Sequence, residues 1–253
     1  MLIVISSILM LSFVITKRKW IGFLAWITTG LAFLQKVPIF LSIHDYFNAT
    51  VFTLASILFC IFGYTALRGN LDVMVEATRF SLLAIVFYFP FELYKPLGNA
   101  LIKIVTDQTF ELGRALGFEF ERVDWNKIFL NGRGVRIILA CTGIESMALF
   151  AGACFGIKAE LSRKIKAFIV SVPVIYVLNL FRNVFVLASY GYGWFGESSF
   201  YIAHNVISKF LATLSLIIIT LLVFRELPEL ERLIVNLKDE VWKVIRGDSE
   251  RGF

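Results

Sequence analysis

Seven long apolar runs divide the chain, and they constrain the fold more than any other feature. They cover residues 1–16, 20–35, 48–67, 75–91, 141–157, 167–190 and 204–224. A helix needs about 20 apolar residues to cross a bilayer, so each run is of spanning or near-spanning length. With 58% hydrophobic residues and a mean hydropathy of +0.78, the chain has more apolar surface than one soluble core can bury. The sequence therefore predicts an all-α polytopic membrane protein with about seven transmembrane helices.

The basic residues between the runs predict the orientation in the cell membrane. Lys17, Arg18 and Lys19 follow the first run, and Arg68 and the cluster at 158–166 fall on alternate connections. Short cytoplasmic loops carry an excess of Lys and Arg, so we expect an N-terminus outside and a C-terminus in the cytoplasm. Because the first run precedes its basic residues, the reverse of a signal peptide, it is expected to stay as an anchor. The net charge of +6 arises from these clusters, so nucleic acid is not an expected partner, whereas membrane lipids are.

The long segment between the fourth and fifth runs is then extracytoplasmic. Residues 97–116 place apolar side chains at helical spacing, which suits a helix on the membrane surface. The Asn131-Gly132 pair that follows is a strong hairpin signal, so a β-hairpin leading into Cys141 is expected. This organisation predicts four parts: N-terminal transmembrane helices in 1–91, an extracytoplasmic insertion in 92–140, catalytic transmembrane helices in 141–224 and a cytoplasmic amphipathic tail in 225–253.

Three reactive side chains on three different spans fall at one depth. Counted from the basic residues at the cytoplasmic end of each span, at about 1.5 Å per residue, Cys141 lies roughly 25 Å, Arg182 roughly 24 Å and His204 roughly 31 Å up. The hydrocarbon core is about 30 Å thick, so all three are expected near the outer face. Intramembrane polar residues are candidates for function because they are costly to bury in lipid. Cys60 and Cys154 lie deeper and are expected to be inert small hydrophobes.

Cysteine, arginine and histidine together provide the groups for acyl transfer through a thioester. The thiolate is the nucleophile, the guanidinium stabilises the developing oxyanion, and the imidazole carries the proton. Thr142 and Gly143 suit a helix start, where free N–H groups favour an anion such as a thiolate.

Further polar residues accompany the three reactive groups. Asn179 and Asn183 flank the arginine on its own span, and Glu145 lies one helical turn below Cys141. Glu145 is a candidate partner either for the arginine or for Lys209. The three cysteines and two histidines show neither CxxC pairs nor metal-ligand spacing, so no disulfide framework, metal or organic cofactor is expected.

Three segments carry a family resemblance. ACTGIES at 140–146, NLFRN at 179–183 and AHNVISK at 203–209 resemble the cysteine, arginine and final motifs of the exosortase and archaeosortase family. The resemblance implies a membrane-embedded cysteine transpeptidase with Cys141 as nucleophile, Arg182 as the family arginine and His204 as the third residue, with Lys209 as an alternative there. It also implies substrates that are surface proteins with a C-terminal transmembrane sorting signal, and an acceptor that in archaeal members is linked to lipid. The chain lacks the long additional domain of some bacterial members, so an archaeosortase is expected.

Two other functions remain open from the sequence. A cysteine peptidase at the membrane interface would use the same residues and release its product by hydrolysis, and only the product distinguishes it. A non-enzymatic transporter would line a polar pathway with Arg182 and Glu145, which predicts polar residues at several depths. The polar residues instead gather at one level, which favours the enzyme.

Overall fold

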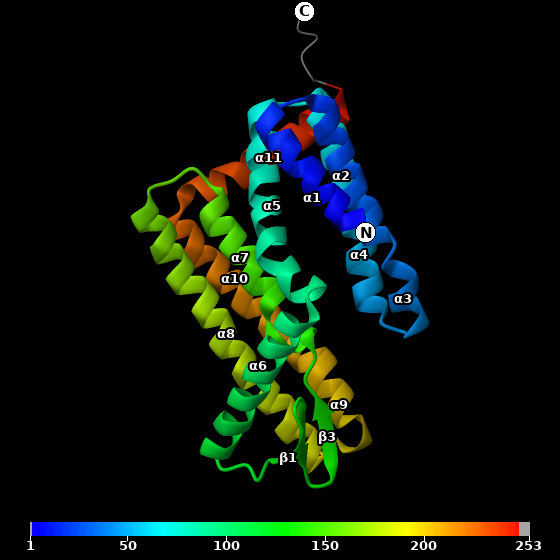
Figure 1. Ribbon diagram of the computed structural model, residues 1–253, viewed down its shortest axis with the longest axis vertical. Helices are drawn as coiled ribbons and strands as arrows, with labels where there is room; N and C mark the ends of the chain where they lie inside the picture. Colours follow the sequence, from blue (N-terminus) through cyan, green and yellow to red (C-terminus); the bar gives the residue numbers. More distant parts are fainter. Residues whose placement is uncertain (1, 248–253) are drawn as a thin grey trace, which may run out of the picture. The chain divides into compact units, whose positions relative to one another are not determined.

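The computed structural model describes residues 2–247, and most of them are helical (Figure 1). The helices are α1 Leu2–Thr16, α2 Lys19–Leu34, α3 Val37–Ser42, α4 Tyr46–Arg68, α5 Leu71–Leu93, α6 Lys95–Ala115, α7 Ile144–Gly156, α8 Leu161–Tyr192, α9 Ser199–Tyr201, α10 Ser208–Glu226 and α11 Pro228–Arg246. The described residues form two compact units. The first consists of residues 2–83, Phe155–Lys158 and residues 229–247. The other takes Ala84–Cys154 and Ala159–Pro228.

The structure confirms an all-α polytopic membrane protein. Within residues 2–247, the helical segments long and apolar enough to cross a membrane are Lys19–Ser42, Tyr46–Arg68, Leu71–Leu93, Leu161–Tyr192 and Gly196–Glu226. These five correspond to five of the seven predicted spans. The first and fifth predicted spans are the apolar helices α1 and α7, which have only 15 and 13 residues.

Close helix packing in the first unit depends on small and hydroxyl-bearing residues. A side chain at Gly30 of α2 would lie 3.0 Å from the carbonyl oxygen of Ser56 on α4, so the two helices approach closely. The Ser56 hydroxyl donates back to the Gly30 carbonyl at 2.8 Å. The buried Trp26 indole donates to Thr78 of α5 at 3.0 Å. Such contacts suit membrane helices, because lipid offers no hydrophobic drive between them.

The predicted amphipathic tail, 225–253, contains α11, and its residues 248–253 lie outside the described part of the chain. Its buried residues are Leu230, Leu233 and Val244. Trp242 is about half exposed, and the Glu240 carboxylate accepts from the Asn70 backbone N–H at 2.7 Å. The helix therefore packs by its apolar side and is tied to the turn between α4 and α5.

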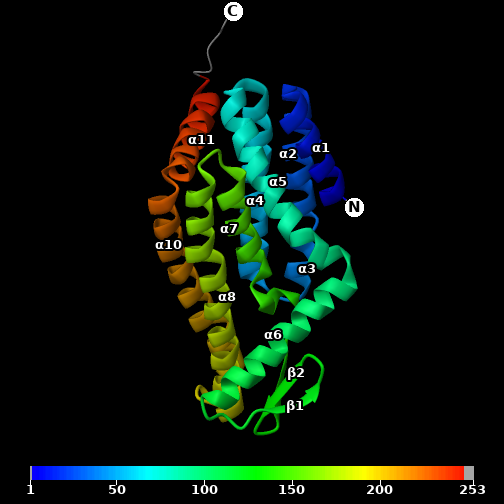
Figure 2. The same ribbon diagram turned by 60° about the vertical axis from the view of Figure 1, so that its left-hand side comes forward.

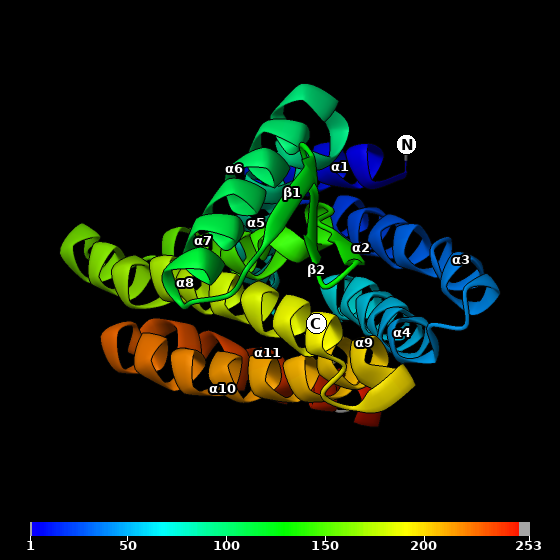
Figure 3. The same ribbon diagram turned by 90° about the horizontal axis from the view of Figure 1, so that it is seen from below.

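In the second unit, α8 and α10 lie side by side, and α6 packs against α8 (Figures 1 and 3). Helix α6 confirms the helix expected over 97–116 and begins with a proline in its first turn. Its buried residues Ile102 and Val105 form a cluster with Ile137, against which Leu139 and Cys141 also pack. The helix thus supports the segment that carries the cysteine.

A small antiparallel sheet follows α6, in the order β1 Glu121–Asp124, β2 Lys127–Leu130 and β3 Arg133–Arg136 (Figure 2). The Asn131-Gly132 turn has positive φ at both positions, +51° and +75°, as a two-residue hairpin turn requires. The predicted hairpin is therefore confirmed, and β1 adds a third strand. Ile128 and Leu130 are buried with Val184 and Leu187 of α8, so the sheet is anchored to that helix.

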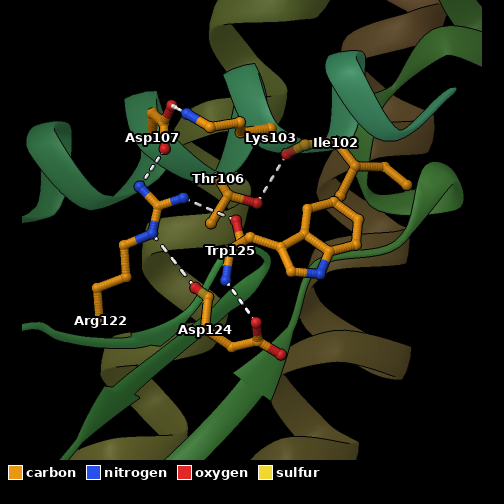
Figure 4. Close-up of polar contacts among 7 residues, drawn as sticks. All are labelled: Ile102, Lys103, Thr106, Asp107, Arg122, Asp124 and Trp125. Atoms are coloured by element: carbon orange, nitrogen blue, oxygen red, sulfur yellow. Dashed lines mark hydrogen bonds and ion pairs between the residues drawn. The ribbon is translucent and has the colours of Figure 1, made fainter. Parts of the chain in front are cut away.

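Arg122 links β1 to α6 by hydrogen bonds and an ion pair (Figure 4). Its guanidinium donates to the Asp107 carboxylate, to the Trp125 carbonyl at 2.7 Å and to the Asp124 carbonyl at 3.3 Å. Lys103 also donates to Asp107, at 2.8 Å. One arginine therefore closes the β1–β2 turn and joins it to the helix.

This cluster predicts an acid sensitivity. Burial would raise the pKa of Asp107, but hydrogen bonds from Lys103 and Arg122 outweigh it and hold that pKa below its ordinary value of 3.8. Because the folded pKa is the lower one, the stabilisation is complete above the ordinary value and is lost as the pH falls through the folded pKa. We expect Asp107→Asn to lower the free energy of unfolding near neutral pH by about 1 kcal/mol or less, since the pair is partly exposed.

Thermal unfolding of both proteins across pH measures this effect. The difference should vanish in strong acid, where the native carboxyl is protonated. Asp239→Asn is a control, because its ion pair with Lys238 is largely exposed at both ends. A stability difference that persists unchanged into acid contradicts the prediction.

Candidate active site

Cys141 lies in a tight turn between the sheet and α7. The chain leaves β3, stays extended at Ile138, and then forms the 3₁₀ turn Leu139–Thr142, in which the Cys141 N–H donates to the Ile138 carbonyl at 2.8 Å. The Thr142 side chain is buried and donates to the Leu139 carbonyl at 2.7 Å. Gly143, at φ +76°, reverses the chain into α7. The cysteine therefore precedes the helix start expected from the sequence.

Two asparagines of α8 hold the main chain of this turn. Asn179 and Asn183 are one helical turn apart and are both buried. Their side-chain amides donate to the Cys141 carbonyl oxygen, at 2.7 and 3.0 Å. A carbonyl that accepts two such bonds cannot rotate without breaking both, so the asparagines fix the position of the cysteine.

Arg182 lies between the two asparagines in sequence and links the other reactive groups. Its Nη2 lies 3.3 Å from Nε2 of His204. It also interacts electrostatically with Cys141. Its Nε is buried without a hydrogen-bond partner among the described residues. A buried N–H donor without an acceptor lowers the stability of the fold. This donor is therefore a candidate to bind an acceptor atom of a ligand.

His204 belongs to a π-helical turn, Ile202–Ile207, ahead of α10. Such turns are rare and frequently occur at functional sites. The imidazole stacks on Phe200, with ring centroids 5.3 Å apart and an interplanar angle of 7°. An arginine can only donate, so Nε2 accepts from Arg182. The proton then belongs on Nδ1, which lies 3.4 Å from Oδ1 of Asn205. These contacts hold the imidazole among Arg182, Asn205 and Phe200.

A cavity of about 480 Å³ opens beside this group, between α7, α8 and α10. Its polar lining includes Asn179, Arg182 and Ser208, and Gly143 also lines it. The remaining wall is mainly apolar, with Ile175, Leu216 and Ile219 among its residues. A mainly apolar cavity with a few polar groups is typical of a ligand site.

Glu145 does not join the arginine. Its electrostatic neighbour is Glu92 of α5, and it also acts on Tyr88. Within residues 2–247 the structure shows no ion pair between Glu145 and Arg182. The pairing considered from the sequence is therefore not made.

The other cysteines and the second histidine lie apart from this group or in the other unit. The Cys154 sulfur is buried, 3.9 Å from the Ser171 hydroxyl. Cys60 and His44 belong to the first unit, where His44 contacts Tyr46. In the described part of the chain, no cluster of three His, Cys, Asp or Glu side chains is placed to hold a metal ion.

The family model of transmembrane exosortases (Exosortase_EpsH) matches residues 3–223, nearly the whole chain. The chain belongs to the transmembrane exosortase family. Archaeosortase A of Haloferax volcanii is 29% identical over 260 residues, covering 89% of this chain and 84% of the relative. Archaeosortase A of Natronomonas pharaonis is 27% identical over 257 residues, covering 89% and 80%. No solved structure matches the chain significantly. The resemblance predicted from the three motifs is confirmed.

In this exosortase-family protein, the sequence predicts the two asparagines as site residues but not their partners. Asn179 and Asn183 are expected as neighbours of Arg182, whereas their contacts are with the cysteine carbonyl. The π-helical turn and the stacking of Phe200 on His204 were missed. The π-helical turn begins before the predicted run 204–224, and apolar periodicity does not distinguish a π turn from an α-helix.

Gly143→Ala is expected to impair this turn in two ways. An L-residue at positive φ costs about 1–2 kcal/mol of stability. In addition, the new Cβ would lie 3.1 Å from Cγ of Asn179, which positions Cys141. We therefore expect lower thermal stability and a loss of activity larger than the stability loss explains.

Gly117→Ala is the matched control. Its φ is +88°, but no atom lies within 4 Å of the added Cβ. It should cost similar stability and leave substrate processing intact. Equal activity losses in the two variants would contradict a positioning role for the Gly143 turn.

Proposed function

We propose that this chain is a membrane-embedded, sortase-like cysteine transpeptidase that cleaves C-terminal sorting signals of surface proteins and transfers the product to an acceptor. The observation that carries the proposal is that one turn of α8 holds the Cys141 carbonyl through its two asparagines and places Arg182 3.3 Å from His204. This joins a nucleophile, a permanent cation and a proton carrier in one group, which is the requirement for acyl transfer.

In the first half-reaction, Nε2 of His204 gives up its hydrogen bond from Arg182 and takes the proton of the Cys141 thiol, and the thiolate attacks the scissile carbonyl. The new carbon–sulfur bond leaves an oxyanion, which accepts a hydrogen bond from the unsatisfied Nε of Arg182. The carbon–nitrogen bond then breaks, and His204 returns the proton to the leaving amine. The product is a thioester between Cys141 and the new C-terminus of the substrate.

In the second half-reaction, an acceptor amine attacks the thioester carbonyl and gives its proton to His204. The carbon–sulfur bond breaks, and the imidazolium returns the proton to the thiolate, so the enzyme is regenerated. A lipid amine is the acceptor we propose, because the relatives are archaeosortases and the site lies within a membrane protein. Attack by water would instead give hydrolysis.

The substrate is proposed to enter laterally, with its own C-terminal helix in the bilayer. The basic residues that follow the first run favour an N-terminus outside and a C-terminus in the cytoplasm. With that orientation, Cys141 lies near the outer face, at the end of an extracytoplasmic sheet. In this scheme residues 141–224 carry the catalytic groups.

The test uses the purified protein in lipid vesicles with a tagged model substrate that ends in a transmembrane sorting signal. Hydroxylamine added during turnover should convert the thioester to a hydroxamate at the new C-terminus, identified by mass. Without hydroxylamine, the product should carry the mass of a lipid acceptor. A free carboxylate alone would show a peptidase, and no cleavage with an authentic substrate would overturn the proposal.

A further inference from the structure

Strand β3 has one unpaired edge. The sheet order is β1-β2-β3, so β3 pairs with β2 on one side only. The pairs run from Leu130 with Arg133 to Lys127 with Arg136. Beyond β3, the Ile137 N–H donates to the Asn126 carbonyl at 2.8 Å, which continues the ladder toward the membrane helices.

The alternation of this ladder shows which backbone groups are unused. In an antiparallel pair every second residue bonds to the partner strand. Because Ile137 bonds to β2, the backbone N–H groups of Gly134, Arg136 and Ile138 face the other way. No backbone bond from these three N–H groups is present in residues 2–247. They form a row of donors at two-residue spacing, with carbonyls between them.

This free edge leads directly to the nucleophile. Ile138 is extended, with φ −121° and ψ 173°, and is 51% exposed. The Cys141 turn begins at the next residue. At about 2.0 Å per residue in a 3₁₀ turn, Cys141 lies roughly 6 Å beyond Ile138. An extended peptide covers that distance in about two residues.

We propose that the β3 edge from Gly134 to Ile138 binds the extended segment of the polypeptide substrate just before its membrane helix, as a fourth strand of the sheet. The inference rests on the proposed function. Main-chain pairing to a free edge is a common way to hold a peptide. β3 runs toward the membrane into α7, and the substrate segment runs toward the membrane into its own helix, so the pairing is parallel. The scissile bond then falls about two residues beyond the residue opposite Ile138.

The other edge of the sheet does not offer the same site. β1 has a register irregularity between Arg122 and Asp124, and both side chains are charged. Bulges and charges are the usual protection of an edge strand against pairing. The Arg122 guanidinium is also occupied at Asp107 and the β1–β2 turn. β1 therefore provides an internal control.

Disulfide trapping tests the proposal on the full chain in vesicles. Arg136→Cys is placed in a background with Cys60, Cys141 and Cys154 changed to alanine, and the substrate carries single cysteines along the segment before the cleaved bond. We expect cross-linking that alternates with a period of two and is strongest roughly four residues before that bond. Val123→Cys on β1, which is also exposed, should give none. Equal cross-linking at consecutive substrate positions, or from both edges, overturns the inference.

A second comparison isolates the backbone donor. Arg136→Pro removes the outward N–H and leaves the β2 pairing intact, whereas Arg136→Ala keeps the N–H. We expect the proline variant to process substrate roughly three- to tenfold more slowly than the alanine variant, the worth of one hydrogen bond. Equal processing rates of the proline and alanine variants would overturn the proposal that the β3 edge binds the substrate, but not the proposed function. Failure of the protein with Cys141 intact to process substrate overturns the proposed function as well.

Discussion

Replacing Cys141 by alanine is expected to abolish substrate processing, by roughly 10⁴-fold or more, as removal of a covalent nucleophile does in other acyl-transfer enzymes. The reason is chemical, since the thiol is the group that forms the covalent bond, and Cys154, the other thiol of this unit, lies against Ser171. Cys141→Ser should also be inactive, because a serine hydroxyl is a much weaker nucleophile without an arrangement built for it. Processing is followed by the mass shift of a tagged substrate in vesicles.

Cys154→Ala is the matched control for this experiment. Cys154 lies further along the chain on α7, where its buried sulfur is 3.9 Å from the Ser171 hydroxyl. Its replacement should leave processing within a few-fold of the native protein and change only stability. If Cys141→Ala still forms product while retaining the native thermal stability, the nucleophile has been assigned to the wrong residue.

Much of the fold could be predicted because its signals are local. Apolar runs predict spanning helices from length alone, and five of seven predicted spans are helices long enough to cross a membrane. The Asn131-Gly132 pair predicts a hairpin because only a few residues tolerate the positive φ values that such a turn needs. Short runs are less decisive, since α7 and α1 are apolar but too short to span as straight helices.

The details of the site could be predicted less well, because they depend on contacts between distant segments. Depth along each span indicated that Cys141, Arg182 and His204 share one level. It could not indicate that Asn179 and Asn183 turn to a carbonyl 38 and 42 positions away. Nor could it place Glu145 beside Glu92, because the rotation of each helix about its axis is decided by packing.

One turn of α8 organises the whole site. Asn179 and Asn183 hold the main chain of the nucleophile, and Arg182 between them reaches His204 on another helix. A helix is rigid over one turn, so these three side chains keep fixed relative positions. This rigidity is what a preorganised oxyanion site requires, since its donors must be aimed before charge develops.

Arg182→Ala is therefore expected to lower processing by about 10²- to 10³-fold, the usual cost of removing an oxyanion donor. Arg182→Lys should recover only part of this loss. A lysine ammonium keeps the charge, but it lacks the planar fork that lets one nitrogen contact His204 while Nε remains available to the oxyanion. Rates are measured at saturating substrate, so that weakened binding does not enter.

The double variant Arg182→Ala with His204→Gln decides whether the two residues act as a unit. Glutamine preserves a polar side chain within the π-helical turn but cannot carry a proton between the thiol and the leaving amine. If Arg182 and His204 serve the same step through their 3.3 Å contact, the double variant should lose much less than the product of the two single losses. Fully multiplicative losses would mean that the arginine and the histidine act independently, and the contact between them would then be structural.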